Sequence, residues 1–252
     1  MKVVFNADDY GLHRQVSLGI LQAMEAGVVR STTVMANLVS REELEWLRAC
    51  PGVSVGLHFN LTRGAPFSGF PRKLLTPDGC FSRELFFRPE GGPVLELEAV
   101  RTELEAQLHV LDGAGIEVTH LDSHHHIHGW AVVLAAAVEL ARERRLAVRP
   151  LSSWMVSYLS SSGIRCPDLL LTGFFGENNA GVEHLQQLLR EAQASGAQTV
   201  EIMCHPGRTE GLSESNSSYI AGRAEELSTL CSHKLPEWLD RAGIRVVGYG
   251  QV

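Results

Sequence analysis

KVVFNADDYG, residues Lys2 to Gly11, joins an apolar, β-branched run to two adjacent carboxylates. The run from Lys2 to Asn6 predicts a buried strand, and the amphipathic stretch HRQVSLGILQAMEA predicts a helix that ends at Gly27. A strand followed directly by a helix is the first part of a βα unit. The two carboxylates are therefore expected where the strand passes into the helix.

The same alternation continues to the last residues of the sequence. Further strands are expected at 31–37, 53–59, 117–123, 146–150, 169–174, 199–204 and 244–249. Further helices are expected at 41–50, 95–112, 130–145, 182–195, 219–231 and 235–242. About eight strands, each followed by a helix or by the chain end, predict an α/β fold of the distorted (β/α) TIM-like barrel type. Because no repeat or Ser/Pro linker interrupts the pattern, we expect a single catalytic domain over residues 1–252.

One segment breaks this rhythm. Residues 60–93 are rich in Gly, Pro and Phe and show no sustained hydrophobic period. A loop of this length in a compact enzyme is usually a lid or a wall of the substrate site. We expect the same role here.

The composition argues against several classes of protein. A hydrophobic content of 44% over 252 residues is enough for a sizeable core. A net charge of -7 without a Lys/Arg stripe argues against a nucleic-acid partner. No apolar run approaches the roughly 18 residues of a membrane span, and the N-terminal run lacks a secretory pattern, so a cytoplasmic protein is expected. The five scattered cysteines include no CxxC pair and predict neither a disulfide framework nor a zinc ribbon.

Side chains that can bind a metal ion or transfer a proton follow several of the predicted strands. Asp8 and Asp9 follow the first strand, and His58, His124 and His205 come at the ends of three others. The carboxyl ends of parallel barrel strands lie on one face, where βα loops build the active site. These side chains are therefore expected to converge, although they are scattered over almost the whole chain.

The stretch THLDSHHHIHGW, from Thr119 to Trp130, is unusually rich in histidine. In an extended strand His120, Asp122 and His124 share one face and His125 points away, a phase that can be followed only to about His124. Alone, such a tract could be a solvated loop that binds metals by chance. Strand ends that carry Asp, His and His favour a metal triad instead.

The two aspartates of NADDYG suit a hydrolytic metal site. Neighbouring residues at a strand end point in different directions, so one carboxylate can bind a cation while the other faces a bound water. The alternative is that one of them only caps the helix that follows. The residues alone leave both readings open.

Together, NADDYG, STTVMAN, GLHFNLT, THLDSHHHIH and EIMCHPG, in this order, resemble the YdjC-like carbohydrate deacetylases, which include chitooligosaccharide deacetylases. The resemblance covers essentially the full chain and departs from the family at Tyr10, where Phe is frequent. It implies a distorted (β/α) barrel with one divalent metal ion. The ligands it implies are Asp9, His58 and His124, and it implies Asp8 as the general base.

The reaction expected from this resemblance is removal of an acetyl group from an N-acetylated sugar, most simply a chitooligosaccharide such as diacetylchitobiose. Another acylated carbohydrate or a glycolipid presents similar chemistry. His205 is the candidate acid for the departing amine, with simple packing as the alternative. Contacts to the sugar are expected from a set of polar and aromatic residues near strand ends: Asn37, Asp122, His126, Trp130, Arg149 and Glu177. For Asp122, orientation of a ligand histidine is the alternative.

The identity of the metal stays open. Mixed nitrogen and oxygen ligation suits magnesium or zinc, and also manganese, cobalt or iron. Two histidines and a carboxylate also occur in non-haem iron oxygenases, and a non-catalytic metal-binding protein is a further alternative. A homodimer is the default expectation for the assembly.

Overall fold

The computed structural model describes residues 1–88, 94–176, 178–214 and 217–252. An eight-stranded parallel sheet forms its centre, with the order β7-β6-β3-β2-β1-β9-β8 and with β10 beside the beginning of β1. The strands are β1 (Lys2–Tyr10), β2 (Ser31–Val34), β3 (Ser54–Phe59), β6 (Val118–Ser123), β7 (Ala147–Val148), β8 (Leu169–Leu171), β9 (Thr199–Cys204) and β10 (Arg245–Val246). All strands expected for the barrel are present, so the predicted α/β architecture is confirmed.

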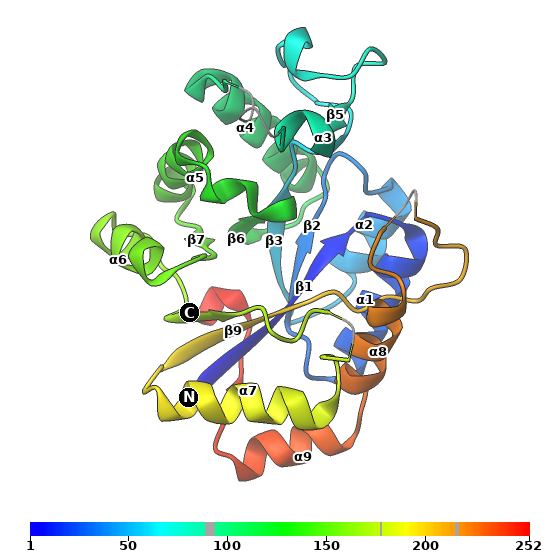
Figure 1. The fold of residues 1–252 in the computed structure, drawn as a ribbon, viewed down its shortest axis with the longest axis vertical. Coiled ribbons are helices and arrows are strands. Elements are labelled where there is room, and N and C mark those ends of the chain that lie inside the picture. Colours follow the sequence, from blue (N-terminus) through cyan, green and yellow to red (C-terminus); the bar gives the residue numbers. More distant parts are fainter. Residues whose placement is uncertain (89–93, 177, 215–216) are drawn as a thin grey trace.

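Helices flank the curved sheet (Figure 1). They are α1 (Arg14–Ala26), α2 (Arg41–Arg48), α4 (Leu97–Gly113), α5 (Ala131–Arg144), α6 (Ser153–Ser161), α7 (Val182–Ala194), α8 (Ala221–Leu230) and α9 (Lys234–Arg241). Sequence analysis predicted all of these except α6. That helix is short and serine-rich, and it starts where the Ser152 hydroxyl accepts a hydrogen bond from the Met155 backbone N–H.

The centre of the sheet is buried on both faces. Residues 3–10 of β1 are all buried, and its first half, Val3 to Phe5, is correspondingly apolar. The sheet curls into a half-barrel. The half-barrel is open because, within the described strands, no ladder joins β7 to β8. The distorted TIM-like barrel expected from the sequence is therefore confirmed in an open form.

Residues 60–88 contain only short elements: β4 (Arg63–Gly64), η1 (Arg72–Leu74), β5 (Phe81–Ser82) and α3 (Arg83–Phe86). This part of the chain projects beyond one end of the sheet, close to α4 (Figure 1). Residues 89–93, the end of the predicted lid or substrate wall, lie outside the described residues. Two 3-10 turns complete the structure, η2 (His124–Gly129) and η3 (Tyr249–Gln251).

No helix within the described ranges combines the length and the apolar character needed to cross a membrane.

Candidate metal and active site

An irregularity at the end of β1 presents its two carboxylates. The pairing between β1 and β2 changes register between Ala7 and Tyr10, which is the signature of a bulge. Asp9 lies inside this irregular segment with φ at 72°, a left-handed conformation that is uncommon for residues other than glycine. Such strain is held in place by the surrounding structure and is frequent at functional sites. It allows neighbouring Asp8 and Asp9 to meet different partners.

Asp9 faces two histidines from other strands. Its Oδ1 lies 3.3 Å from Nε2 of His58, at the end of β3, and 3.0 Å from Nδ1 of His124, directly after β6. The three candidate ligand atoms lie within 4.8 Å of one another. Oδ1 is buried and has no hydrogen-bond partner among the described residues, although Oδ2 has one. An orphaned carboxylate oxygen beside two imidazole nitrogens fits a divalent cation.

A second group, Asp8, His58 and Asp122, also has the spacing of metal ligands. Its carboxylate oxygens are, however, already engaged by hydrogen bonds and ion pairs inside the protein. Binding a cation there would require these contacts to break. The cluster of Asp9, His58 and His124 is therefore the better metal site.

Asp122 orients His58. The His58 Nδ1–H donates to Asp122 Oδ1 at 2.7 Å, and the Thr33 hydroxyl donates to Asp122 Oδ2 at 3.0 Å. This contact leaves Nε2 of His58 directed at Asp9, the arrangement that commonly fixes a metal-binding histidine. Burial alone lowers the pKa of His58, but Asp122 and Asp9 raise it to about 10. Metal binding at Nε2 therefore requires His58 to release a proton.

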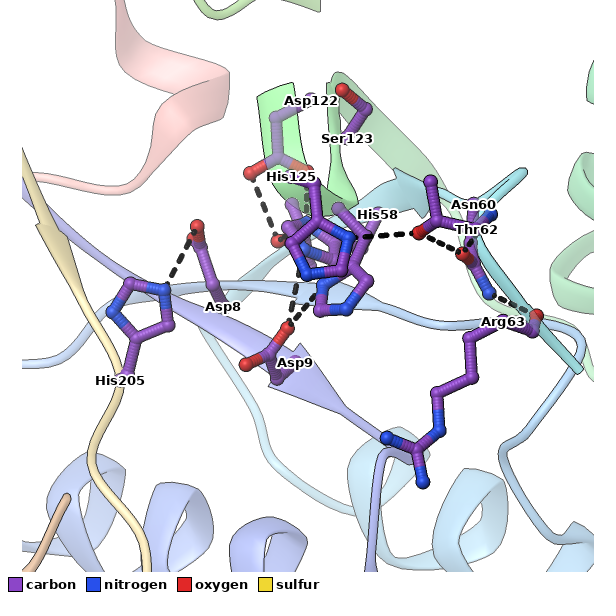
Figure 2. A network of polar contacts seen from close by, with 12 residues as sticks. Asp8, Asp9, His58, Asn60, Thr62, Arg63, Asp122, Ser123, His125 and His205 are labelled. Atoms are coloured by element: carbon purple, nitrogen blue, oxygen red, sulfur yellow. Dashed lines mark hydrogen bonds and ion pairs between the residues drawn. The ribbon is translucent and has the colours of Figure 1, made fainter. Parts of the chain in front are cut away.

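Asp8 lies on the side of the site that is nearer to β9 and His205 (Figure 2). Both of its oxygens accept hydrogen bonds from Arg149, at 2.7 and 2.6 Å. Arg149 is completely buried, and it also contacts Glu201 at 2.6 Å and Asp122 at 2.9 Å. Although burial raises the pKa of Asp8, the charge and hydrogen bonds of Arg149 bring it below its usual value. Asp8 is thus an ionised carboxylate in a fixed orientation.

His205 follows β9 and approaches Asp8 from the side opposite His58 (Figure 2). Its Nε2 lies 3.9 Å from Asp8 Oδ2, and its Nδ1 is buried without a hydrogen-bond partner among the described residues. Burial lowers the pKa of His205 to about 4, despite the opposing charges of Asp8 and Asp9. The imidazole is therefore neutral at neutral pH and free to accept a proton.

The other histidines of the 119–130 stretch have separate surroundings. His120 is buried and stacks on Tyr249 at 4.0 Å, and His128 contacts Ser123 and the backbone oxygen of Arg149. His125 shares a hydrogen bond with Thr62 at 2.9 Å. His126 has a buried Nδ1 without a partner among the described residues. Of this stretch, only His124 lies against Asp9.

Several residues expected to contact the sugar are engaged within the protein. Arg149 and Asp122 are buried and bind Asp8 and His58, and Asp122 thus has the contact of a residue that orients a ligand histidine. Their contact with sugar hydroxyls stays a prediction. Asn37 donates to the backbone oxygens of Arg63 and Ala65 and so fastens the start of the 60–88 segment.

Trp130 and Glu177 complete the set expected to contact the sugar. Trp130 is half-buried against Phe86, with ring centroids 4.6 Å apart. Glu177 lies outside the described residues. His126 therefore remains the polar member of that set with an unpartnered atom beside the site.

Two exposed phenyl rings flank the centre. Phe175 lies 5.1 Å from the ring of His205, and Phe87 lies 6.2 Å from the ring of His125, edge to face. Their residues are 41% and 42% exposed, whereas most large apolar residues are buried.

Sequence analysis also missed the supports contributed by α8 and the loop before it. Arg223 Nη2 donates to Asp9 Oδ2 at 2.6 Å. Glu226 accepts hydrogen bonds from the His205 backbone N–H and from the Tyr219 hydroxyl, the latter at 2.8 Å. In the sequence these residues look like the solvated face of a helix. Only the contacts of α8 with Asp9 and with the loop after β9 reveal their partners.

The chain is similar to known proteins over almost its full length. Residues 2–241 match the family described as YdjC-like protein. A carbohydrate deacetylase from Halalkalibacterium halodurans is 34% identical over 94% of this chain and 98% of its own. A carbohydrate deacetylase from Oceanobacillus iheyensis is also 34% identical, over 95% of this chain and all of its own. The chain belongs to the YdjC-like family, which confirms the resemblance seen in the sequence.

Solved structures agree with this assignment. A protein from Enterococcus faecalis V583, described as a cellobiose-phosphate cleavage protein, has a TM-score of 0.87 and 30% identity over 99% of this chain and 98% of its own. A family 4 carbohydrate esterase from Streptomyces lividans, in complex with acetate, has a TM-score of 0.54 and 12% identity, over 97% of this chain and 91% of its own. At that identity the second likeness concerns the fold alone.

Proposed function

We propose that this protein is a metal-dependent hydrolase that removes the acetyl group from an N-acetylated sugar. The observation that carries the proposal is the pair Asp8 and Asp9. Asp9 turns a free oxygen toward two histidines, while Asp8 is ionised, lies beside them and is held by an arginine. The relatives named carbohydrate deacetylases support this reaction class.

Asp9, His58 and His124 would hold one divalent ion. Zinc or magnesium is our first expectation, with manganese, cobalt and iron as alternatives for a mixed set of oxygen and nitrogen ligands. When bound, such an ion acidifies water and polarises a carbonyl group.

Asp8 and His205 would move the protons of the reaction. Asp8 takes one proton from water as the water oxygen bonds to the acetyl carbon. His205, 3.9 Å from Asp8, takes over this proton and gives it to the nitrogen as the C–N bond breaks. The products are acetate and a free amino sugar. Because the pKa of His205 is lowered to about 4, it is neutral before the reaction and fits a relay better than a stored acid.

A chitooligosaccharide such as diacetylchitobiose is the substrate that we propose first. The exposed ring of Phe175 beside His205 and that of Phe87 beside His125 offer apolar faces on two sides of the centre, as stacking of sugar rings requires. We also keep His126 as a proposed sugar contact, although its unpartnered Nδ1 is buried in this structure. The segment 60–93 would form the wall of the substrate site.

The first test is incubation of the metal-loaded protein with N,N'-diacetylchitobiose, followed by assay of acetate and of the mass of the sugar. Loss of one acetyl group by the wild type and silence of Asp8→Asn support the proposal. A matched control is Asp78→Asn, an exposed residue with a pKa lowered by local hydrogen bonds. No acetate from this sugar, but acetate from another acylated carbohydrate or a glycolipid, would replace the substrate and keep the reaction.

No release of acetate from any acylated carbohydrate would contradict the proposed reaction. The alternatives are then an iron-dependent oxygenase or a protein that only binds metal. Oxygen consumption in the presence of iron and a 2-oxoacid would favour the first, and metal binding without any turnover would favour the second. A cytoplasmic location and a homodimer stay predictions, and light scattering of the purified protein tests the homodimer.

A further inference from the structure

Arg223 makes a contact that the proposed reaction does not use. The residue belongs to α8, is only 2% exposed, and donates from Nη2 to Asp9 Oδ2 at 2.6 Å. A hydrogen bond of this length between a guanidinium and a carboxylate is of the strong, charge-assisted kind. Its acceptor is the carboxylate whose other oxygen, Oδ1, faces His58 and His124.

The guanidinium of Arg223 is fixed from several sides. Nε and Nη2 lie 3.4 Å from the Ser217 hydroxyl oxygen, and Nη1 donates to the backbone oxygen of His205 at 3.4 Å. The backbone N–H of Gly207 donates to the backbone oxygen of Arg223 at 3.1 Å. A side chain at Gly207 would meet Cδ of Arg223 at 3.2 Å, so the loop after β9 packs closely against the arginine. Arg223 therefore presents Nη2 from a defined position.

The two ends of the Asp9 carboxylate thus have different occupants. Oδ2 is taken by Arg223, and Oδ1 is buried without a hydrogen-bond partner among the described residues. A carboxylate with both oxygens free can bind a cation through both, and it then takes up one more coordination position. Catalytic metal sites keep a position open for water or substrate beside three protein ligands.

We propose that Arg223 restricts Asp9 to binding the metal through one oxygen, Oδ1, and so preserves the open coordination position. Arg223 is then a positioning residue, because it acts through Asp9. The inference rests on the metal site of the proposed function and not on the identity of the substrate. It also accounts for the choice of arginine, because its rigid fork holds Oδ2 in one direction while its other donors bind the loop.

The test uses cobalt(II), whose visible absorption weakens when its coordination number rises. The variants are Arg223→Met, which removes the donor, and Arg223→Lys, which keeps the charge with a single ammonium group. Arg208→Met is the matched control, because it removes the same charge from an exposed arginine of the loop after β9, which contacts Gln22. Each protein is titrated with cobalt by calorimetry, and its absorption is measured at one equivalent of metal.

We expect Arg223→Met to bind one cobalt with an affinity within about tenfold of the wild type, because all three ligand atoms remain. Its absorption should be weaker than that of the wild type, and turnover should fall about 100-fold with little change in KM. Arg223→Lys should restore part of the absorption and part of the turnover. Arg208→Met should match the wild type in every measurement.

The proposal is overturned if Arg223→Met has the absorption of the wild type, since Asp9 then binds in the same way without the arginine. It is also overturned if the affinity falls more than about tenfold, because Arg223 would then build the metal site and not restrict it. If Arg223→Met does not fold, Arg223→Lys decides, and reduced turnover with an unchanged absorption refutes the inference. A wild type that shows the expected absorption but releases no acetate leaves this inference standing and removes only the substrate.

Discussion

Asp8 and Asp9 are adjacent in the chain, yet they belong to two different environments. Both oxygens of Asp8 accept hydrogen bonds from the completely buried Arg149, which also contacts Glu201. Oδ2 of Asp9 accepts a hydrogen bond from Arg223, while Oδ1 faces His58 and His124. Two identical side chains therefore differ in which oxygens are left without a hydrogen bond, because different arginines bind them.

The sharpest test of this comparison exchanges each aspartate for asparagine. Asp9→Asn should lose most of its metal affinity, because a neutral amide replaces an anionic ligand. Asp8→Asn should keep the metal and lose about 10³-fold in turnover, since it removes a general base. Calorimetric metal titration and acetate release measure the two effects. Equal loss of metal in both variants would mean that the environments do not separate the roles.

The two histidines of the Asp9 side should contribute alike. His58→Ala and His124→Ala each remove one nitrogen ligand, so each should weaken metal binding by more than about 100-fold. His125→Ala is the control, because that ring bonds to Thr62 and not to Asp9. A histidine-rich loop that binds several metals would behave differently: His58→Ala would have little effect, and the stoichiometry would exceed one.

Substitution of Arg149, which binds Asp8, should mainly lower the free energy of unfolding. Arg149→Met leaves buried carboxylates without their counter-charge, and loss of one partner of such a cluster costs about 3–5 kcal/mol in the free energy of unfolding. Arg101→Met is the matched control, because Arg101 pairs with Glu139 and Glu143 at the surface, where such pairs contribute less than about 1 kcal/mol. Urea unfolding of the metal-free proteins compares them. A loss as small as that of the control would show that Arg149 is not needed to balance the cluster.

The smallest expected effect is on the pH dependence of stability, and it concerns Glu226, which accepts a hydrogen bond from the His205 backbone. Burial raises the pKa of Glu226 to about 8, although hydrogen bonds from the His205 backbone and from Tyr219 oppose this shift. The folded state therefore holds a proton that the unfolded state has released between about pH 4.5 and 8, so this contribution to stability is lost as the pH rises. Glu226→Gln should remove this dependence. Its stability relative to the wild type should increase by up to about 3 kcal/mol from pH 5 to pH 8.

Unfolding curves of the metal-free proteins at both pH values provide this measurement. Glu225→Gln is a suitable control, because that residue is exposed on the same helix. If both variants change in parallel with the wild type, Glu226 does not hold its proton at neutral pH.

Sequence reasoning succeeded where burial repeats along the chain. The strands were predicted because a parallel sheet covered on both faces requires continuous apolar runs, as in β1. The helix α6 was missed because its first turn depends on the Ser152 hydroxyl and not on a strong apolar stripe. Residues 60–88 fold into short elements whose stabilising contacts leave no period in the sequence.

The candidate site divides in the same way. The positions of Asp8, Asp9, His58, His124 and His205 at strand ends could be predicted, because the carboxyl ends of parallel strands meet on one face. The sequence predicts a sugar contact for Arg149 and, for Asp122, either a sugar contact or the orientation of a ligand histidine, but it does not reveal that both residues are buried. The structure shows Arg149 bonded to Asp8 and Asp122 bonded to His58.

The amino-acid sequence by itself determined the barrel class and the set of reactive side chains, since the hydrophobic period and the alternation of strands and helices along the chain are local properties. Only the tertiary structure decided which oxygen of which aspartate is free. That choice depends on Arg149 and Arg223, which are 141 and 214 residues away from their aspartates along the chain. Contacts over such separations form only when the loop after β7 and the helix α8 reach the end of β1, and no local pattern encodes them.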